Sequence, residues 1–277
     1  QREDYDHWRQ LGNPGWSFED VLPYFRKSED QQRGASEYHG AGGPLAVSDR
    51  KTPHVLCDAF IEAAAARGYP RTDDFNGPQH EGFGYLQLTA RNGRRCSTAV
   101  GFLRPARKRA NLHVVTRAHA TRILFDGSRA TGIEYSRDGA RFTARAAGEV
   151  ILSGGAINSP QLLQLSGIGP AALLREHGIA MVADRPGVGD NLQDHFNIRL
   201  VYRSTVPETL NDALNNPLRG ALELARYAFR RDGYLAMGAS VVAGFIRTDP
   251  AVATPDAQVS LTLFSADKIG QKLHPFS

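Results

Sequence analysis

The chain has 277 residues, of which 41% are hydrophobic and 22% are charged, so it can bury a sizeable core and is not predicted to be disordered. Its formal net charge of +4 comes from basic residues scattered among acidic ones, which excludes the basic stripe typical of nucleic-acid binding, so we expect no nucleic-acid partner. Two cysteines, Cys57 and Cys96, exclude a disulfide scaffold and are expected to be small buried residues in a reducing compartment.

Residues 1–33 are predicted to be mainly helical and rich in aromatic side chains, and residues 34–43 to form turns. Ser17 is suited to cap a helix, because Glu19 and Asp20 then place negative charge in its first turn. A turn-rich link follows, and we expect a short strand over residues 44–48.

The next helix is predicted to begin with Thr52 as its N-cap and Pro53 at its first helical position. Apolar residues then recur at helical spacing until Gly68, which ends the helix. After a loop, we expect a strand over residues 83–90 and a helix over about 98–108.

The chain becomes β-rich after this helix. Strands are predicted over residues 112–116, 121–126, 131–136 and 142–153, with Asp-Gly turns between some of them. The last of these runs should end in a buried strand, residues 149–153. Helices are expected at about 159–166 and 170–177.

The last third of the chain begins with a polar, Gly-broken loop over residues 186–195. We expect a strand over 196–203, a helix that begins at Asn216-Pro217, and strands over 239–247 and 257–264.

No segment has the character of a membrane span or a secretory leader. The N-terminal residues are charged, and the longest apolar run, Leu235 to Ile246, is shorter than the ~20 residues that a spanning helix needs. The expected location is therefore cytoplasmic, with peripheral association with the inner membrane left open.

The junction between the strand at 149–153 and the helix that follows has the composition of a ligand site. Gly154, Gly155 and Ala156 are small enough to let a ligand approach the backbone. A helix N-terminus also favours negative charge, because its free N–H groups and the positive end of its dipole point outward. These features are compatible with an anionic ligand, or with a tight turn alone.

Residues 154–169, GGAINSPQLLQLSGIG, resemble the second signature of the glucose–methanol–choline (GMC) oxidoreductases at all its fixed positions. The resemblance implies FAD as cofactor, with its ADP part against this strand end. It makes Ser153, Gly154 and Gly155 candidate cofactor-binding residues.

Other segments resemble the same family in the same order, namely residues 4–29, 75–106, 111–135 and 186–195. In the third of them the family's backbone meets the adenine, often at a Val, and Ala120 stands at that position. In the fourth, Asn191 is the residue expected to support the cofactor near the junction of the two domains.

The resemblance implies an α/β protein, with α+β elements, in which part of a GMC-type FAD-binding domain is intertwined in sequence with an antiparallel-sheet substrate domain. Residues 1–43 are then a helical segment after the flavin loop, and 44–110 belong mainly to the substrate domain. Residues 111–195 belong mainly to the FAD-binding domain, and 196–277 return to the substrate domain, which is truncated.

Two family motifs are absent from the sequence. No Gly-x-Gly-x-x-Gly follows a strand, so the pyrophosphate-binding fingerprint is expected upstream of Gln1. The family's catalytic His is expected beyond Ser277, because His274-Pro275 resembles its motif only superficially. We therefore assign no catalytic residue, interpret the chain as an interior fragment, and expect it not to oxidise alcohols by itself.

The resemblance implies an FAD-dependent oxidoreductase acting on the CH–OH group of donors, which oxidises a primary alcohol to an aldehyde by hydride transfer to flavin. The substrate is a small alcohol, either choline-like or aliphatic, and the electron acceptor stays open. A quaternary ammonium would need aromatic or acidic groups, and the aromatic candidates are Phe83, Tyr85, Tyr202, Phe245 and Phe264. No residue spacing suits a metal site. The alternatives are a truncated, non-catalytic module and, if the signature match were accidental, a carbohydrate- or peptide-binding domain.

Overall fold

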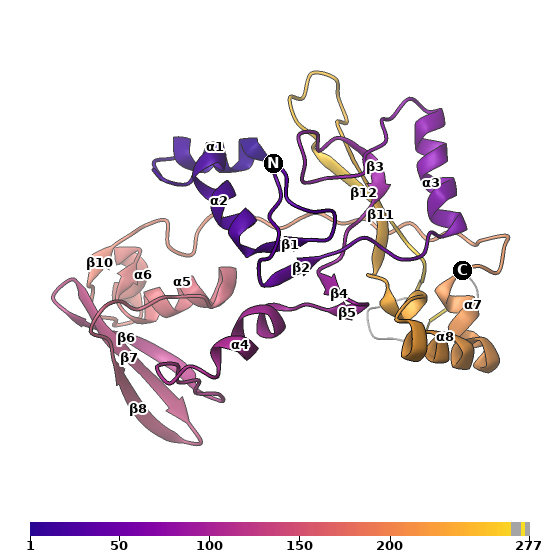
Figure 1. The fold of residues 1–277 in the computed structure, drawn as a ribbon. Helices are drawn as coiled ribbons and strands as arrows, with labels where there is room; N and C mark the ends of the chain where they lie inside the picture. The colour runs from indigo at the N-terminus through magenta and orange to yellow at the C-terminus, as the bar shows by residue number, and fades with distance from the viewer. Residues whose placement is uncertain (267–272, 275–277) are drawn as a thin grey trace. The chain divides into compact units, whose positions relative to one another are not determined.

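The computed structural model describes residues 1–266 and 273–274, and it divides into two compact units. Unit 1 comprises residues 1–110 and 200–277, and unit 2 comprises residues 111–199. Figure 1 shows the elements of both units along the chain.

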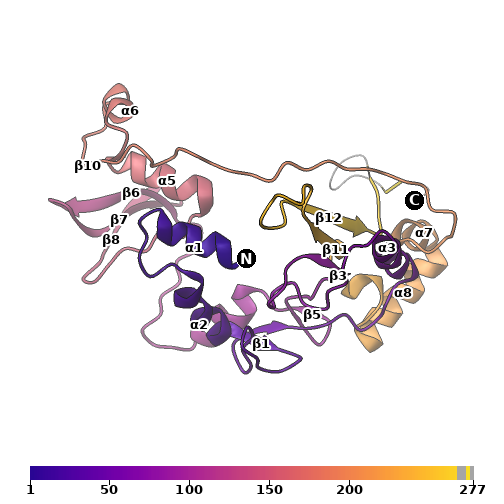
Figure 2. The ribbon, with the colours of Figure 1, turned by 90° about the horizontal axis from the view of Figure 1, so that it is seen from above.

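Unit 1 contains a three-stranded antiparallel sheet in the order β12-β11-β3, formed by β3 (Gly82–Tyr85), β11 (Ser240–Ile246) and β12 (Ala257–Thr262). Helix α3 (Val55–Ala66) packs against β3 and β11, and both Figure 1 and Figure 2 show it beside this sheet. The core lies between them and contains Cys57, Ile61, Val241, Val242 and Leu263. β3 and β11 pack on α3, and the partly buried Leu261 of β12 packs against the same core, so strands distant in sequence are paired here.

Unit 1 contains further elements outside this core. They are α1 (Arg2–Gln10), α2 (Phe18–Ser28), the parallel pair β1 (Glu29–Gln31) and β2 (Leu45–Val47), and the hairpin β4 (Ala90–Arg91) and β5 (Arg94–Arg95). They continue with η1 (Ala99–Leu103), α4 (Arg104–Ala106), α7 (Leu210–Asn215), α8 (Pro217–Arg230) and η2 (Tyr234–Ala236). The predicted cap of α2 is confirmed, because Ser17 Oγ accepts the N–H of Asp20.

Unit 2 is built on an antiparallel meander of β6 (His119–Asp126), β7 (Arg129–Arg137) and β8 (Ala140–Arg145). Helix α5 (Gly155–Leu165) packs on β6. Beyond it lie β9 (Ile168–Gly169), α6 (Ala171–Glu176) and β10 (Ala183–Asp184), with β9 and β10 paired in parallel. The α/β class and the antiparallel sheets expected from the sequence are confirmed.

Three predicted strands are wrong. Residues 112–116, 149–153 and 196–203 contain no strand, and their apolar side chains lie mostly in solvent; Ile151 is 76% exposed and Phe196 is 91% exposed. A strand needs a neighbour to satisfy its backbone N–H and C=O groups. In the described part of the chain no other strand pairs with these runs, so they stay extended.

The predicted helix over 98–108 is also different. It is a π-helical turn followed by the short α4, and the N–H of Arg104 reaches back to the carbonyl of Ala99. Pro105 cannot donate to a carbonyl four residues back, so a regular α-helix would lose a hydrogen bond there.

The N-cap predicted for α3 is two residues too early. His54 caps the helix instead of Thr52, because its Nδ1 accepts the N–H of Leu56 at 3.3 Å, and Pro53 precedes the cap. In the described residues no helix is both long and apolar enough to cross a membrane.

Candidate functional site

The small-residue junction of unit 2 is an open helix start. Gly154 is the N-cap of α5, and its N–H donates to Ser159 Oγ at 2.9 Å. Gly155 has φ of +83°, a left-handed conformation that favours glycine. Residues 153–158 are exposed, so no other residue of unit 2 covers this junction.

The charge at the start of α5 suits an anion. Helices α1 and α2 carry acidic side chains in their first turn, whereas α5 carries none. The positive end of its dipole and the first free N–H groups are therefore left for another negative group. These N–H groups begin at Gly155, because that of Gly154 already donates to Ser159 Oγ, and they fit a negatively charged ligand.

The opposite end of α5 is fixed to the sheet by a buried serine. Ser166 Oγ accepts the N–H of Ile123 in β6 at 2.8 Å and donates to the carbonyl of Leu162 at 2.5 Å. The next residue, Gly167, has φ of +90°, and a Cβ there would lie 2.3 Å from the carbonyl oxygen of Ala180. The second half of the signature thus holds the helix in place. The polar residue Ser166 is the only feature of the sequence that could have indicated this role.

Ala120 lies on β6, where it pairs with Tyr135 of β7. The register of the two strands shifts between Ala120 and Arg122. The residue outside the regular ladder is Thr121, next to Ala120, and such a bulge locally bends the strand. Because α5 packs on β6, Ala120 and the α5 junction belong to neighbouring elements.

Asn191 lies in the loop after β10, exposed and with φ of +55°. Its Oδ1 accepts from Gln193 Nε2 at 3.3 Å. The loop is held by Gln164, whose Nε2 donates to the carbonyl of Val188 at 2.8 Å. Gln164 belongs to the last turn of α5, about 15 Å along the helix axis from Gly154, so this tether is at the far end of the helix from the junction.

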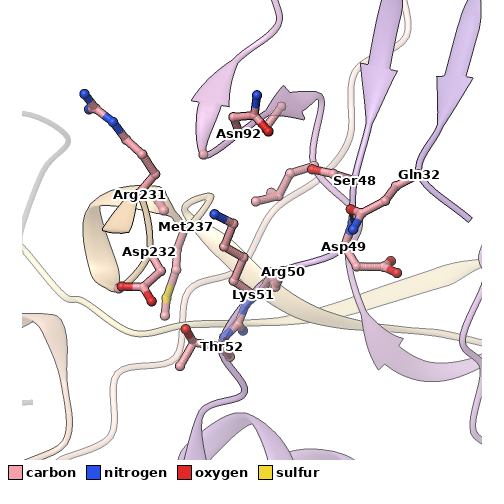
Figure 3. Close-up of a pocket in the computed structure, with 15 residues that line it drawn as sticks. Gln32, Ser48, Asp49, Arg50, Lys51, Thr52, Asn92, Arg231, Asp232 and Met237 are labelled. Atoms are coloured by element: carbon pink, nitrogen blue, oxygen red, sulfur yellow. Dashed lines mark hydrogen bonds between the residues drawn. The ribbon is translucent and has the colours of Figure 1, made fainter. Parts of the chain in front are cut away.

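Unit 1 contains two neighbouring cavities. One, of about 240 Å³, is shown in Figure 3, and the other has about 460 Å³. Asp49, Arg50 and Thr52 line both. In Figure 3 the Lys51 side chain extends into the first cavity. Sequence reasoning missed this polar segment, which links β2 to α3.

Arg50, which lines both cavities, packs on Tyr85, which lines the second. The Arg50 guanidinium lies over the Tyr85 ring, 4.7 Å from its centroid. The Tyr85 hydroxyl donates to Asp58 Oδ1 at 2.5 Å. Burial, followed by this hydrogen bond to a carboxylate, raises the pKa of Tyr85 to about 12. Tyr85 therefore stays a neutral phenol at physiological pH.

A second polar chain runs from the cap of α3. His54 Nδ1 is an acceptor, so His54 Nε2 carries the proton that it shares with Tyr234 Oη at 3.1 Å. Tyr234 in turn donates to the carbonyl of Glu208 at 3.0 Å. Burial, then the charge of Arg50, lowers the pKa of His54, so this ring is neutral and serves to fix α3.

Both cysteines are buried, as expected. Burial raises the pKa of Cys57 to about 11, although the neighbouring Arg50 opposes the rise. A thiol with such a pKa is inert as a nucleophile near neutral pH.

The aromatic candidates do not form one cage in the described residues. Phe83 packs against Phe60 and Tyr69, with ring centroids 5.6 and 5.4 Å away. Phe245 lies 5.0 Å from Phe75. Tyr202 is 78% exposed, and a cation already covers a face of Tyr85.

Known proteins resemble this chain over most of its length. The family described as "GMC oxidoreductase" matches residues 1–197. The human protein "Choline dehydrogenase, mitochondrial" is 47% identical over 256 residues, which are 92% of this chain and 43% of that protein. "Oxygen-dependent choline dehydrogenase" from Ectopseudomonas mendocina (strain ymp) is 48% identical over 263 residues, 92% of this chain and 46% of that protein.

Solved structures show the same fold. An FAD-dependent oxidoreductase from Chaetomium thermophilum superposes with a TM-score of 0.78 at 27% identity, over 89% of this chain and 46% of that one. The chain therefore spans less than half the length of the relatives it matches.

Proposed function

Because the chain belongs to the GMC oxidoreductase family, we propose that it is part of an enzyme that oxidises a primary alcohol to an aldehyde by hydride transfer to a flavin. FAD is the cofactor. When bound, it supplies the isoalloxazine ring that accepts the hydride. The observation that carries the proposal is the uncovered, acid-free start of α5 at the family signature.

Three groups of this chain would hold the cofactor. The exposed backbone at Ser153, Gly154 and Gly155 would lie against its ADP part, and the strand backbone at Ala120, next to the bulge of β6, would meet the adenine. Asn191, in its left-handed conformation, would support the site from the loop after β10. The same assignment makes unit 2 mainly FAD-binding and unit 1 mainly substrate-binding.

A choline-like alcohol is the first substrate to test, because both relatives are named choline dehydrogenases. An aliphatic primary alcohol is the second candidate. It is favoured by the dispersed aromatic rings and by Arg50 over Tyr85, since a guanidinium repels a quaternary ammonium at that face. We further propose a cytoplasmic location and no catalytic base among these residues.

The cofactor assignment can be tested on the 277-residue chain by titration with FAD, followed by flavin fluorescence. At Gly154 a Cβ would lie 3.2 Å from Asn158 Cβ and 3.3 Å from Ser159 N, whereas at Gly148 it would meet nothing within 4 Å. Gly154→Val should weaken FAD binding by roughly tenfold or more, about 1.4 kcal/mol, and Gly148→Val should leave it unchanged.

A folded chain that shows no FAD affinity would instead support the non-catalytic module. The activity itself is tested by adding choline or an aliphatic alcohol to the flavin-loaded protein under anaerobic conditions. Bleaching of the flavin is expected when the chain is part of a protein as long as its relatives. Turnover by residues 1–277 alone would contradict our assignment of the base to another part of the enzyme.

A further inference from the structure

The smaller cavity of unit 1, shown in Figure 3, is walled mainly by three segments that are distant in sequence. They are the link between β2 and α3 at residues 48–52, the β4–β5 hairpin at residues 90–93, and the connection from α8 to η2 at residues 231–233. All three segments belong to unit 1, so the cavity lies within one compact unit.

Two polar side chains of α8 hold these walls in place. Tyr227 donates its hydroxyl to the carbonyl of Gly93 at 3.2 Å, which joins the helix to the hairpin. Glu223 Oε2 accepts the N–H of Tyr234 at 3.1 Å, which joins the helix to η2. The segments around the cavity are therefore fixed relative to one another, as the walls of a ligand site usually are.

The two carboxylates of the cavity lining already have arginine partners. Asp49 Oδ2 accepts from Arg33 Nε at 2.8 Å, and its Oδ1 accepts from Gln87 Nε2 at 2.8 Å. Asp232 Oδ1 accepts from Arg226 Nε at 2.6 Å. The negative charge of the lining is therefore largely compensated before any ligand enters.

Lys51 places a positive charge in the cavity. Its ammonium group has three N–H donors, and among the described residues it meets the carbonyl of Arg230 alone, at 3.4 Å. Figure 3 shows the Lys51 side chain extending into the cavity, whereas the Arg231 side chain extends away from Lys51. The Arg231 guanidinium lies over the Tyr227 ring, 4.9 Å from its centroid. Lys51 is therefore the cation that a ligand in this cavity meets.

Arg50 adds a second positive charge beside Lys51. It lines the cavity, and its Nε and Nη1 are buried with no hydrogen-bond partner in the part of the chain that the structure describes. Its Nη2 donates to the carbonyl of Thr52, which is uncharged. A buried cation without a counter-ion is costly, so an anion in the cavity would stabilise Arg50.

Uncharged donors complete the lining. Thr52 Oγ1 accepts from Arg226 Nη2 at 3.3 Å, which leaves its own O–H free to donate. The Ser48 hydroxyl and the Asn92 amide form no hydrogen bond with another described residue. Two cations and several unused donors around one cavity suit an oxyanion, because each of its oxygens accepts charge-assisted hydrogen bonds.

We propose that this cavity binds a phosphate group, held by the Lys51 ammonium and by the hydroxyls of Ser48 and Thr52. The ligand is inorganic phosphate or a phosphate monoester small enough for a volume of about 240 Å³. Phosphate suits the site better than a carboxylate, because it carries up to two negative charges and more acceptor oxygens. The proposed FAD contacts lie in unit 2, so this site of unit 1 can be tested without the flavin.

Methionine NMR tests this inference, because the chain has two methionines and one of them lines the cavity. Met237 belongs to the lining, and Met181 belongs to unit 2. In the 277-residue chain labelled with 13C at its methionine methyl groups, inorganic phosphate should shift the Met237 signal in a saturable way and leave the Met181 signal in place. Met181→Leu assigns the two signals. Glycerol 3-phosphate provides the second arm: the same shift extends the site to esters, and its absence restricts the site to the free ion.

Lys51→Gln should raise the Kd of phosphate by about tenfold or more, because it removes a charged donor. Ser48→Ala should raise it by about threefold. Lys108→Gln is the matched control, because Lys108 is an exposed lysine of unit 1 that does not line the cavity. It should bind phosphate like the unchanged chain.

The inference is overturned if the Met237 signal does not move with phosphate up to about 10 mM, which would fill about nine-tenths of a site whose Kd is about 1 mM. It is also overturned if Lys51→Gln binds phosphate as well as Lys108→Gln does. An equal shift with potassium chloride at the same ionic strength would show a general salt effect and would overturn it too.

Discussion

The three-stranded sheet of unit 1 and the apolar run at residues 149–153 of unit 2 have similar sequences but different structures. Val242 on the central strand β11 is fully buried between β3 and β12, whereas Ile151 is 76% exposed and unpaired. Both runs are β-branched and apolar. The difference lies in their neighbours: β11 has a partner strand on each side, and residues 149–153 have none in the described part of the chain. Local propensity therefore becomes a strand only where the chain supplies the edge that it pairs with.

The largest expected effect on this comparison is that of a charged residue placed in the buried sheet of unit 1. Val242→Asp places a carboxylate in the core beside Cys57 and Ile61, and an unpaired buried charge should cost more than about 4 kcal/mol. We expect loss of cooperative unfolding in urea, measured by circular dichroism.

An exposed run that pairs with no strand supplies the control. Ile198→Asp falls in the run at 196–203, where Ile198 is 71% exposed, and should change the free energy of unfolding by less than about 0.5 kcal/mol. A loss of stability as large as that of Val242→Asp would mean that this run is packed after all.

The next largest effect is expected at a buried histidine that ties the loops of unit 1 together. His39 Nδ1 lies 3.0 Å from the Glu29 carboxylate, and His39 Nε2 lies 2.9 Å from Asp74 Oδ2. Burial alone would lower the pKa of His39, but the hydrogen bonds to Glu29 and Asp74 outweigh it, so the pKa is raised. Gln31 is the other polar group at the ring.

Because the folded pKa of His39 exceeds its unfolded value, its contribution is complete below the unfolded pKa of about 6.5 and is lost as pH rises through the folded pKa. His39→Gln should cost about 2–3 kcal/mol at pH 6 and less at pH 9. Urea unfolding of both proteins across this range measures the difference. A difference that does not shrink with rising pH would show that His39 is not charged in the fold.

Much of unit 1 could be predicted from sequence, because capping residues mark where its helices begin. Ser17 is the N-cap of α2 and Asn216 is the N-cap of α8. The bounds of β11 and β12 lie within a residue or two of the predicted strands. The cap of α3 was missed because a histidine caps only when its Nδ1 is held as an acceptor, and Tyr234, distant in sequence, holds His54 that way. Pairing partners are likewise set by tertiary structure, which explains the three wrong strands.

The site shows the same division. The residues of the signature identify the start of α5, yet their pattern does not distinguish Gly154 at the open end from Ser166 at the buried end. The stacked pair of Arg50 and Tyr85 has no sequence motif, since its members come from a loop and from β3. The individual cofactor contacts stay predictions.

The stability of unit 2 should depend on the contact that attaches α5 to β6. Ser166→Ala leaves the N–H of Ile123 without its partner in a buried position, at a cost of about 2 kcal/mol. Hydrogen exchange at the Ile123 amide should accelerate roughly thirtyfold. Ser128→Ala, in the exposed β6–β7 turn, should leave that amide unchanged; equal exchange in both variants would mean that α5 is held by other contacts.

The smallest expected effect concerns α8, which is attached by its polar side and so gains little from apolar burial. Its N-cap should then matter more than it would in a core helix. Asn216 Oδ1 accepts the N–H groups of Leu218 and Arg219 at 3.1 and 3.2 Å. Asn216→Ala should destabilise the chain by about 1 kcal/mol, and Asn216→Ser, which keeps a capping oxygen, by a few tenths at most. If the two variants had equal melting temperatures, the polar contacts of Glu223 and Tyr227 alone would be holding the helix, and the cap would be dispensable even on the exposed side of the molecule.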